Sequence, residues 1–182
     1  MSNHVHHRGC GCLAGLSRRH FFAGAAGVAL AAPGLAHAQY QAPAKQTYEA
    51  MLLKCIDPRF TSFTWSYMAS RSLKDLYSQF NIAGGPVAAV APAFEAWRKT
   101  WWDNLEISIG LHQINRVIGI CHRDCGAAVV AYGDQIKKDR AFETAKLTEA
   151  LRTFRTEVGR RYPKLGVELG IMDVNGAVET VS

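Results

Sequence analysis

Cysteine and charge are scarce in this sequence, and each shortage excludes a class of protein. The 182 residues include 5 cysteines, an odd number that is too small for a scaffold held together by disulfides. Charged residues make up 20% and hydrophobic residues 48%, so the composition is that of a folded domain rather than a disordered chain. No internal repeat is visible, and the length corresponds to about one domain.

Acidic residues are absent from positions 1–38, which contain three arginines. An apolar run at 21–32 follows the pair Arg18 and Arg19, and a small-x-small site, AHA, ends the segment at residue 38. This order is typical of a secretory signal peptide. The apolar run is shorter than the ~20 residues that span a bilayer, so no stable membrane span is expected.

The stretch around the two arginines, SRRHFF at 17–22, resembles a twin-arginine export signal. We therefore expect residues 1–38 to be a cleaved signal peptide, and the protein to be exported, to the periplasm, by the twin-arginine machinery. An ordinary secretory signal and an uncleaved anchor are the alternatives.

Removal of this segment changes how the remaining composition is interpreted. Three arginines leave with it, so the net charge falls from +6 to +3. No basic run with interleaved aromatics remains, and we expect no nucleic-acid partner. Two histidines and three cysteines stay in residues 39–182: His112, His122, Cys55, Cys121 and Cys125.

Residues 39–182 read as one domain in which strands and helices alternate. Short apolar runs predict strands at 50–55 and 116–121, and 76–82 is a further strand candidate, closed by the breaker cluster AGGP at 83–86. Helical spacing predicts helices at 94–112, 126–132 and 141–162, with one more inside 60–73, and the charges of the last helix predict a solvated face. Asn175-Gly176 predicts a C-terminal hairpin or edge strand within 166–181. This order indicates an α/β domain with a central, mostly parallel sheet flanked by helices.

Two motifs that carry chemistry follow two of these strands. Residues 55–59 read CIDPR after the first strand, and residues 122–126 read HRDCG after a later one. Ligand sites of open α/β sheets gather at the carboxyl ends of strands, so the two motifs are expected to meet. Two cysteines and one histidine, with a fourth position open, form a known catalytic zinc set. A helix beginning after Cys125 favours the thiolate that such a site needs.

The two motifs together resemble those of the β-class carbonic anhydrases, and the similarity extends over about residues 48–180. The resemblance implies a β-carbonic-anhydrase-like zinc domain with one Zn²⁺ per chain, held by Cys55, His122 and Cys125. It also implies a catalytic pair, Asp57 and Arg59, and a homodimer or larger assembly. The implied activity is that of a zinc lyase, a carbonate dehydratase, in which zinc-bound hydroxide converts CO2 reversibly to bicarbonate.

Three differences from the family pattern leave alternatives open. Residues 79–85, QFNIAGG, replace a stretch in which the family has an arginine; Pro58 replaces a small polar residue; and the N-terminal helices used by many members for dimerisation are largely absent. Hydrolysis of carbonyl sulfide or carbon disulfide at the same site is one alternative, and zinc binding without catalysis is another. The family also includes members in which the aspartate closes the fourth zinc position.

Other polar residues near the motifs have structural explanations. Cys121 is expected to lie in the core and to point away from its neighbour His122, because successive strand residues face opposite sides. His112 is expected at a helix end, Asp124 at a helix cap or a dimer contact, and the Gly84–Gly85 pair in a tight turn.

Overall fold

A computed structural model describes residues 47–182 of the chain. The expected signal peptide at 1–38 lies outside the described residues. Within the described part, no helix has the length and apolar character needed to cross a membrane.

A five-stranded sheet forms the centre of the domain, in the order β2-β1-β3-β4-β5. The first four strands of that order are parallel, and β5 runs antiparallel to β4. Because β1 lies between β2 and β3, it is an interior strand, and the residue after it lies at the carboxyl end of the sheet between its neighbours. The strands are β1 (Ala50–Lys54), β2 (Tyr77–Asn81), β3 (Arg116–His122), β4 (Gly166–Met172) and β5 (Val178–Thr180).

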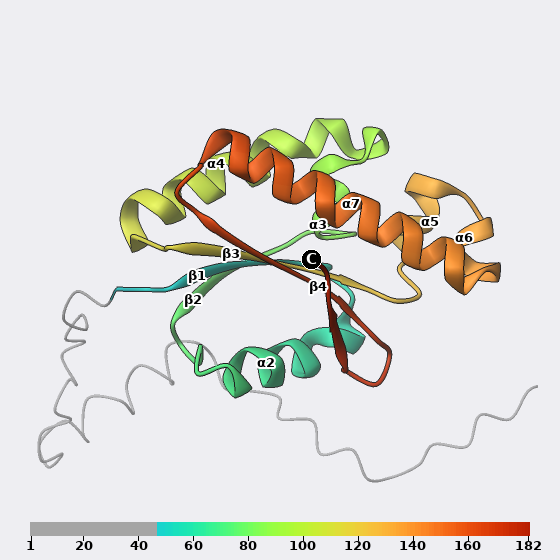
Figure 1. Cartoon of the computed structure of the whole chain (residues 1–182), viewed down its shortest axis with the longest axis horizontal. Coiled ribbons are helices and arrows are strands. Elements are labelled where there is room, and N and C mark those ends of the chain that lie inside the picture. The colour runs from blue at the N-terminus through green and yellow to red at the C-terminus, as the bar shows by residue number, and fades with distance from the viewer. Residues whose placement is uncertain (1–46) are drawn as a thin grey trace, which may run out of the picture. The chain divides into compact units, whose positions relative to one another are not determined.

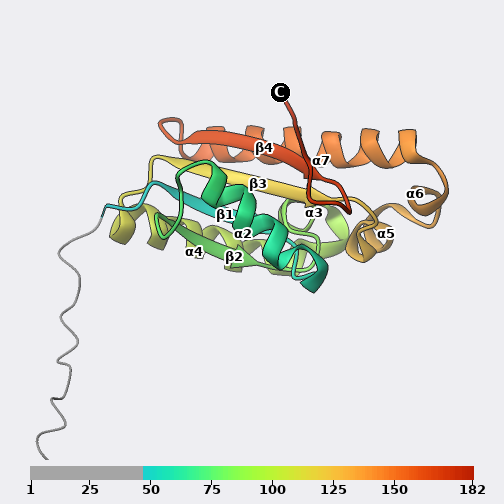
Figure 2. The ribbon, with the colours of Figure 1, turned by 90° about the horizontal axis from the view of Figure 1, so that it is seen from below.

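Helices cover both faces of this sheet (Figures 1 and 2). On one face lie α3, α4 and α7, with α5 and α6 at the end where the parallel strands finish; α2 lies on the other face. The α-helices are α2 (Thr61–Ser70), α3 (Pro86–Val90), α4 (Glu95–His112), α5 (Gly126–Tyr132), α6 (Gln135–Lys138) and α7 (Arg140–Arg161), and 3-10 turns occupy Pro58–Phe60 and Pro92–Phe94.

The alternation of side chains along the strands divides the core into two layers. Leu53 and Cys121 belong to the layer under α3, α4 and α7, whereas Leu52 and Ile120 belong to the layer that packs on α2. Neighbouring strand residues therefore face opposite layers, as the pleat requires. Both faces are buried, which explains why these strands appear in the sequence as continuous apolar runs.

The predicted fold class is confirmed, and each predicted strand and helix is present within about two residues of its expected bounds. The C-terminal hairpin is also present, with Gly176 at φ +87° in its turn. Two short helices, α3 and α6, were not predicted. The first begins at Pro86, directly after Gly84-Gly85; such a cluster is a breaker signal, yet proline also suits the first position of a helix.

Candidate metal centre

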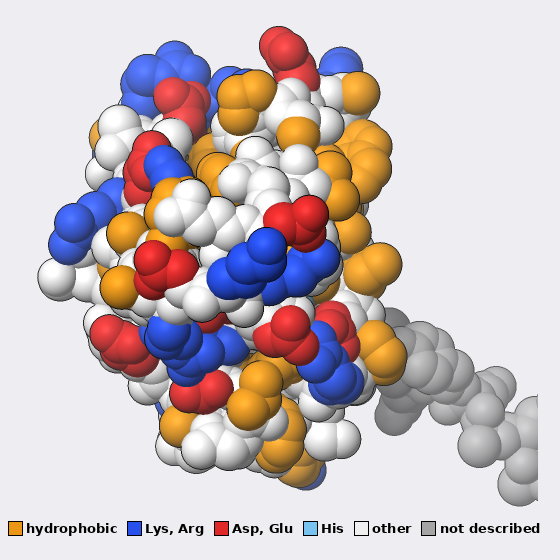
Figure 3. All heavy atoms as spheres, turned by 90° about the vertical axis from the view of Figure 1, so that its right-hand side faces the viewer, with side chains coloured by type: hydrophobic (Ala, Val, Ile, Leu, Met, Phe, Trp, Pro, Cys, Tyr) orange, Lys and Arg blue, Asp and Glu red, His pale blue; other side chains and the backbone are white. Residues whose placement is uncertain are grey.

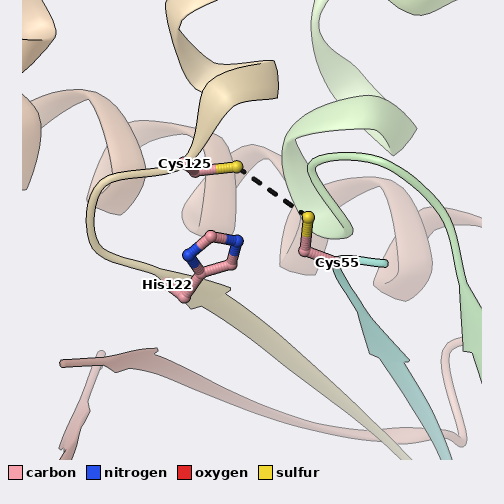
Figure 4. Close-up of side chains that lie close together, drawn as sticks. All are labelled: Cys55, His122 and Cys125. Atoms are coloured by element: carbon pink, nitrogen blue, oxygen red, sulfur yellow. Dashed lines mark hydrogen bonds between the residues drawn. The ribbon is translucent and has the colours of Figure 1, made fainter. Parts of the chain in front are cut away.

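The carboxyl ends of β1 and β3 bring together the three predicted metal ligands (Figure 4). Cys55 follows the last residue of β1, His122 ends β3, and Cys125 precedes the first residue of α5. All three are buried, and their ligand atoms lie within 4.8 Å of one another. Residues 70 positions apart in the sequence therefore form one cluster, which could hold a metal ion.

The imidazole of His122 is oriented as a metal ligand. Its Nδ1 lies 2.8 Å from the carbonyl oxygen of Arg123. A carbonyl only accepts, so Nδ1 carries the proton and Nε2 keeps its lone pair. That Nε2 is buried and has no hydrogen-bond partner among residues 47–182, while the ring packs in a tilted arrangement against Phe60, with 4.1 Å between centroids. A buried acceptor without a partner is costly, and a bound metal ion would satisfy it.

The two thiols of the cluster have the separation that a shared metal requires. The Sγ atoms of Cys55 and Cys125 are 4.0 Å apart, close to the ~3.8 Å expected between two thiolates in tetrahedral zinc coordination at about 2.3 Å. None of the three described cysteines is in a disulfide. The donor set and its spacing therefore suit zinc.

Local hydrogen bonds favour a thiolate at Cys55. Its Sγ lies within hydrogen-bond distance of Cys125 Sγ and accepts from the backbone N–H of Gly84 at 3.2 Å. The bond from Cys125 and the backbone bond from Gly84 lower the pKa of Cys55. The same bond to Cys55, together with burial, raises the pKa of Cys125. Metal ligation requires deprotonated sulfur, so a divalent cation bound between the two would displace the thiol proton that remains.

Asp57 and Arg59 form a close ion pair beside the cluster. The Nη2 of Arg59 donates to Asp57 Oδ2 at 2.7 Å, and its Nε lies 3.1 Å from Oδ1. These hydrogen bonds lower the pKa of Asp57. Asp57 Oδ2 also lies 4.0 Å from Nε2 of His122. The carboxylate is therefore ionised and lies next to the position that a metal ion would occupy.

Of the two roles expected for Asp124, the helix cap is wrong, and the dimer contact stays a prediction. Asp124 has φ +57°, a left-handed conformation, and Cys125 takes the N-cap position of α5. Its carboxylate instead accepts from Nη1 of Arg59 at 2.8 Å, and its carbonyl oxygen accepts from Nη2 at 3.2 Å. Arg59 thus joins the two motifs through both aspartates, a contact that the sequence did not predict.

The Gly84–Gly85 turn forms the wall on the other side of Cys55. Both glycines have positive φ, +86° and +54°, and a Cβ on Gly85 would lie 2.8 Å from the carbonyl carbon of Lys54. The expected tight turn is confirmed. Beside it is a hollow of about 400 Å³ whose lining is mainly apolar: Ile56, Asn81, Ile82, Ala83, Ala96, Trp97 and Thr100.

Cys121 and His112 lie apart from the cluster, as expected. Cys121 is in the core, and burial raises its pKa to about 12. His112 ends α4, where its Nδ1 is 2.5 Å from Ser78 Oγ. Ser78 is paired with Met51, near the start of β1. His112 therefore lies toward the amino-terminal end of the parallel strands, opposite the end that carries the cluster.

No protein-family sequence model matches the chain. Two uncharacterized proteins are similar to it: one of Rickettsia conorii, 28% identical over 72% of this chain and 70% of its own, and one of Rickettsia bellii, 29% identical over 72% and 80%. Similar solved structures include a β-carbonic anhydrase of Aspergillus fumigatus (15% identity, 75% of this chain and 76% of that one, TM-score 0.47). A β-carbonic anhydrase of Trichomonas vaginalis is similar over 91% and 98% of the two chains (12% identity, TM-score 0.48).

Figure 3 views the domain from the side on which the parallel strands end. Acidic and basic side chains alternate across the middle of this surface, and apolar side chains gather along one margin. The ligand cluster lies beneath the surface, since His122 and Cys125 are 2% and 4% exposed. A metal ion bound there would be shielded from bulk water on most sides.

Proposed function

We propose that the protein is a zinc-dependent carbonic anhydrase that converts CO2 and water to bicarbonate. The observation that carries the proposal is the buried Cys55, His122 and Cys125 cluster, with an unsatisfied Nε2 and the ionised Asp57 4.0 Å from it. This donor set leaves a fourth coordination position for water, and the motifs resemble those of the β-class enzymes.

The protein side chains would supply binding, orientation and charge. Zinc, when bound, lowers the pKa of a coordinated water to about 7 and so supplies the nucleophile. The Arg123 carbonyl keeps His122 in the tautomer that offers Nε2. Asp57 is an acceptor beside the reacting position, and its ion pair with Arg59 keeps it ionised and oriented.

A stopped-flow measurement of CO2 hydration on the zinc-loaded protein tests this proposal. We expect one zinc per chain and turnover that is lost when zinc is chelated. Cys55→Ser should lose the metal, whereas Cys121→Ser, which changes a core thiol on the same sheet, should keep it. Zinc bound at one per chain without turnover of CO2 or of its sulfur analogues would leave a non-catalytic zinc protein.

Hydrolysis of carbonyl sulfide or carbon disulfide is a second candidate, supported by the apolar hollow next to the Gly84–Gly85 turn, which is lined by none of the three candidate ligands. Ile82 in the altered 79–85 segment lines the mainly apolar hollow with Ile56 and Trp97. Apolar surface at this place suits linear sulfur compounds, which are less polar than bicarbonate. Parallel assays with CO2, carbonyl sulfide and carbon disulfide on the same preparation would rank the three substrates.

Export and assembly complete the proposal. The SRRHFF segment supports export by the twin-arginine route, which we expect to carry the folded, zinc-loaded protein, so that Cys55 and Cys125 reach an oxidising compartment already protected by metal. Exposed apolar side chains along α4, Trp97, Ile107 and Leu111, support a homodimer or larger assembly. Sedimentation equilibrium measures its size.

A further inference from the structure

Glu143 is a buried carboxylate on α7 that belongs to neither motif. It is 6% exposed, although the sequence predicted that the charges of this helix face solvent. Its Oε1 accepts the backbone N–H of Asp124 at 2.7 Å. Asp124 has a positive φ, a conformation that is costly for a residue other than glycine unless its surroundings hold it. Glu143 provides one such contact.

Two arginines hold Glu143 in this position. Its Oε2 lies 3.3 Å from Nη1 of Arg123 and 3.3 Å from Nη1 of Arg140. Arg123 is itself 5% exposed, and its Nη1 also donates to Thr144 Oγ1 at 2.6 Å. A buried carboxylate paired on one oxygen and bonded to backbone on the other is fully satisfied. It can therefore fix the loop against α7.

The loop that Glu143 holds carries two candidate ligands. The side chain of Arg123 contacts Glu143, and its carbonyl oxygen accepts a hydrogen bond from Nδ1 of His122. Asp124, whose N–H contacts Glu143, directly precedes Cys125 and binds Arg59. Through Arg123 and Asp124, Glu143 is thus linked to the candidate ligands His122 and Cys125. Through Asp124 it is also linked to Arg59, the partner of Asp57.

We propose that Glu143 is a positioning residue of the metal centre, which sets the geometry of His122 and Cys125 by bonding to the loop between them. This inference rests on the proposed function, because it assumes that the cluster binds zinc. A purely structural role is the competing explanation, in which Glu143 only attaches α7 to the sheet. The two explanations differ in whether substitution of Glu143 changes the affinity and the coordination geometry of the bound metal.

Metal affinity and cobalt spectra separate these explanations. Zinc affinity of the full chain is measured by competition with a chelator, and the visible spectrum is recorded with Co²⁺ in place of zinc. For Glu143→Ala we expect a zinc Kd raised about 10- to 100-fold, the usual effect of losing a contact behind the ligands, together with an altered Co²⁺ spectrum. Glu143→Gln keeps an oxygen acceptor for the Asp124 N–H and should restore most of the affinity.

Glu149→Ala is the matched control, since Glu149 is an exposed carboxylate on the same helix, paired with Lys146. It should bind zinc as the wild type does. If Glu143→Ala does not fold, Glu143→Asp replaces it, because the shorter side chain withdraws the acceptor by one methylene. Wild-type zinc affinity and an unchanged Co²⁺ spectrum in the folded variant would overturn the inference alone. A wild-type chain that takes up no zinc would overturn the proposed function first, and the inference with it.

Discussion

Replacing Gly85 by alanine should damage both the stability of the domain and its metal centre. Gly85 has φ +54° and ψ −120°, a region that glycine alone enters freely, and an alanine held there costs about 1–3 kcal/mol. The new Cβ would also lie 2.8 Å from the Lys54 carbonyl carbon and 3.0 Å from the Cys55 nitrogen. These are backbone atoms at the end of a central strand, so they cannot move aside cheaply. We expect a loss of about 3 kcal/mol in the free energy of unfolding, the upper end of this strain.

The same substitution at Gly110 is the control, and its sign is opposite. Gly110 lies within α4, and a Cβ there would meet nothing within 4 Å. Alanine at such a site reduces the freedom of the unfolded chain and should add about 0.4–1 kcal/mol. Urea unfolding of the metal-free, reduced proteins measures both values, because bound zinc would add its own stabilisation.

The zinc affinity of the two variants makes the test more specific. The Gly84–Gly85 turn donates the Gly84 N–H to Cys55 Sγ, so a distorted turn should weaken zinc binding in Gly85→Ala and leave it unchanged in Gly110→Ala. A free energy of unfolding for Gly85→Ala within about 0.5 kcal/mol of wild type, the usual range of a surface substitution, would refute the reasoning.

Three further predictions concern the hydrophobic core, the Asp57–Arg59 ion pair and the expected export signal. Phe154→Ala should cost about 3–5 kcal/mol by urea unfolding, because this fully buried ring leaves a large cavity. Arg59→Gln should raise the pKa of Asp57, measured by carboxyl NMR titration; the stabilisation from the lowered pKa is complete above the unfolded value near 3.9 and is lost as the pH falls below it. Replacing Arg18 and Arg19 by lysine should retain the protein in the cytoplasm upon cell fractionation, and undiminished export would exclude the twin-arginine route.

The ligand cluster could be predicted because each part of it is local in the sequence. Cys55 and His122 each stand at the end of an apolar run, and parallel strands finish at one edge of a sheet. The alternation along β3 likewise separates Cys121 from His122 without any knowledge of the tertiary structure. Motif spacing and strand periodicity were therefore enough to bring residues 70 positions apart into one site.

The supports of the cluster could not be predicted in this way. Glu143 is one of several carboxylates on a charged helix, and only the packing of α7 against the sheet distinguishes it from exposed neighbours such as Glu149. Asp124 resembled a cap because aspartate often precedes helices, whereas in the structure it has a positive φ and its N–H is bound by Glu143. Such roles arise from tertiary contacts that leave no local pattern in the chain.

Folding and metal binding are expected to be coupled in this domain. Without a metal ion, the buried His122 Nε2 has no partner within the described residues, which costs about 1–3 kcal/mol. The thiols of Cys55 and Cys125 are held 4.0 Å apart with one favoured as a thiolate. One divalent cation would satisfy the nitrogen and neutralise both sulfurs, so part of its binding energy stabilises the fold. The same contacts that prepare the site therefore make the metal-free domain less stable than the loaded one.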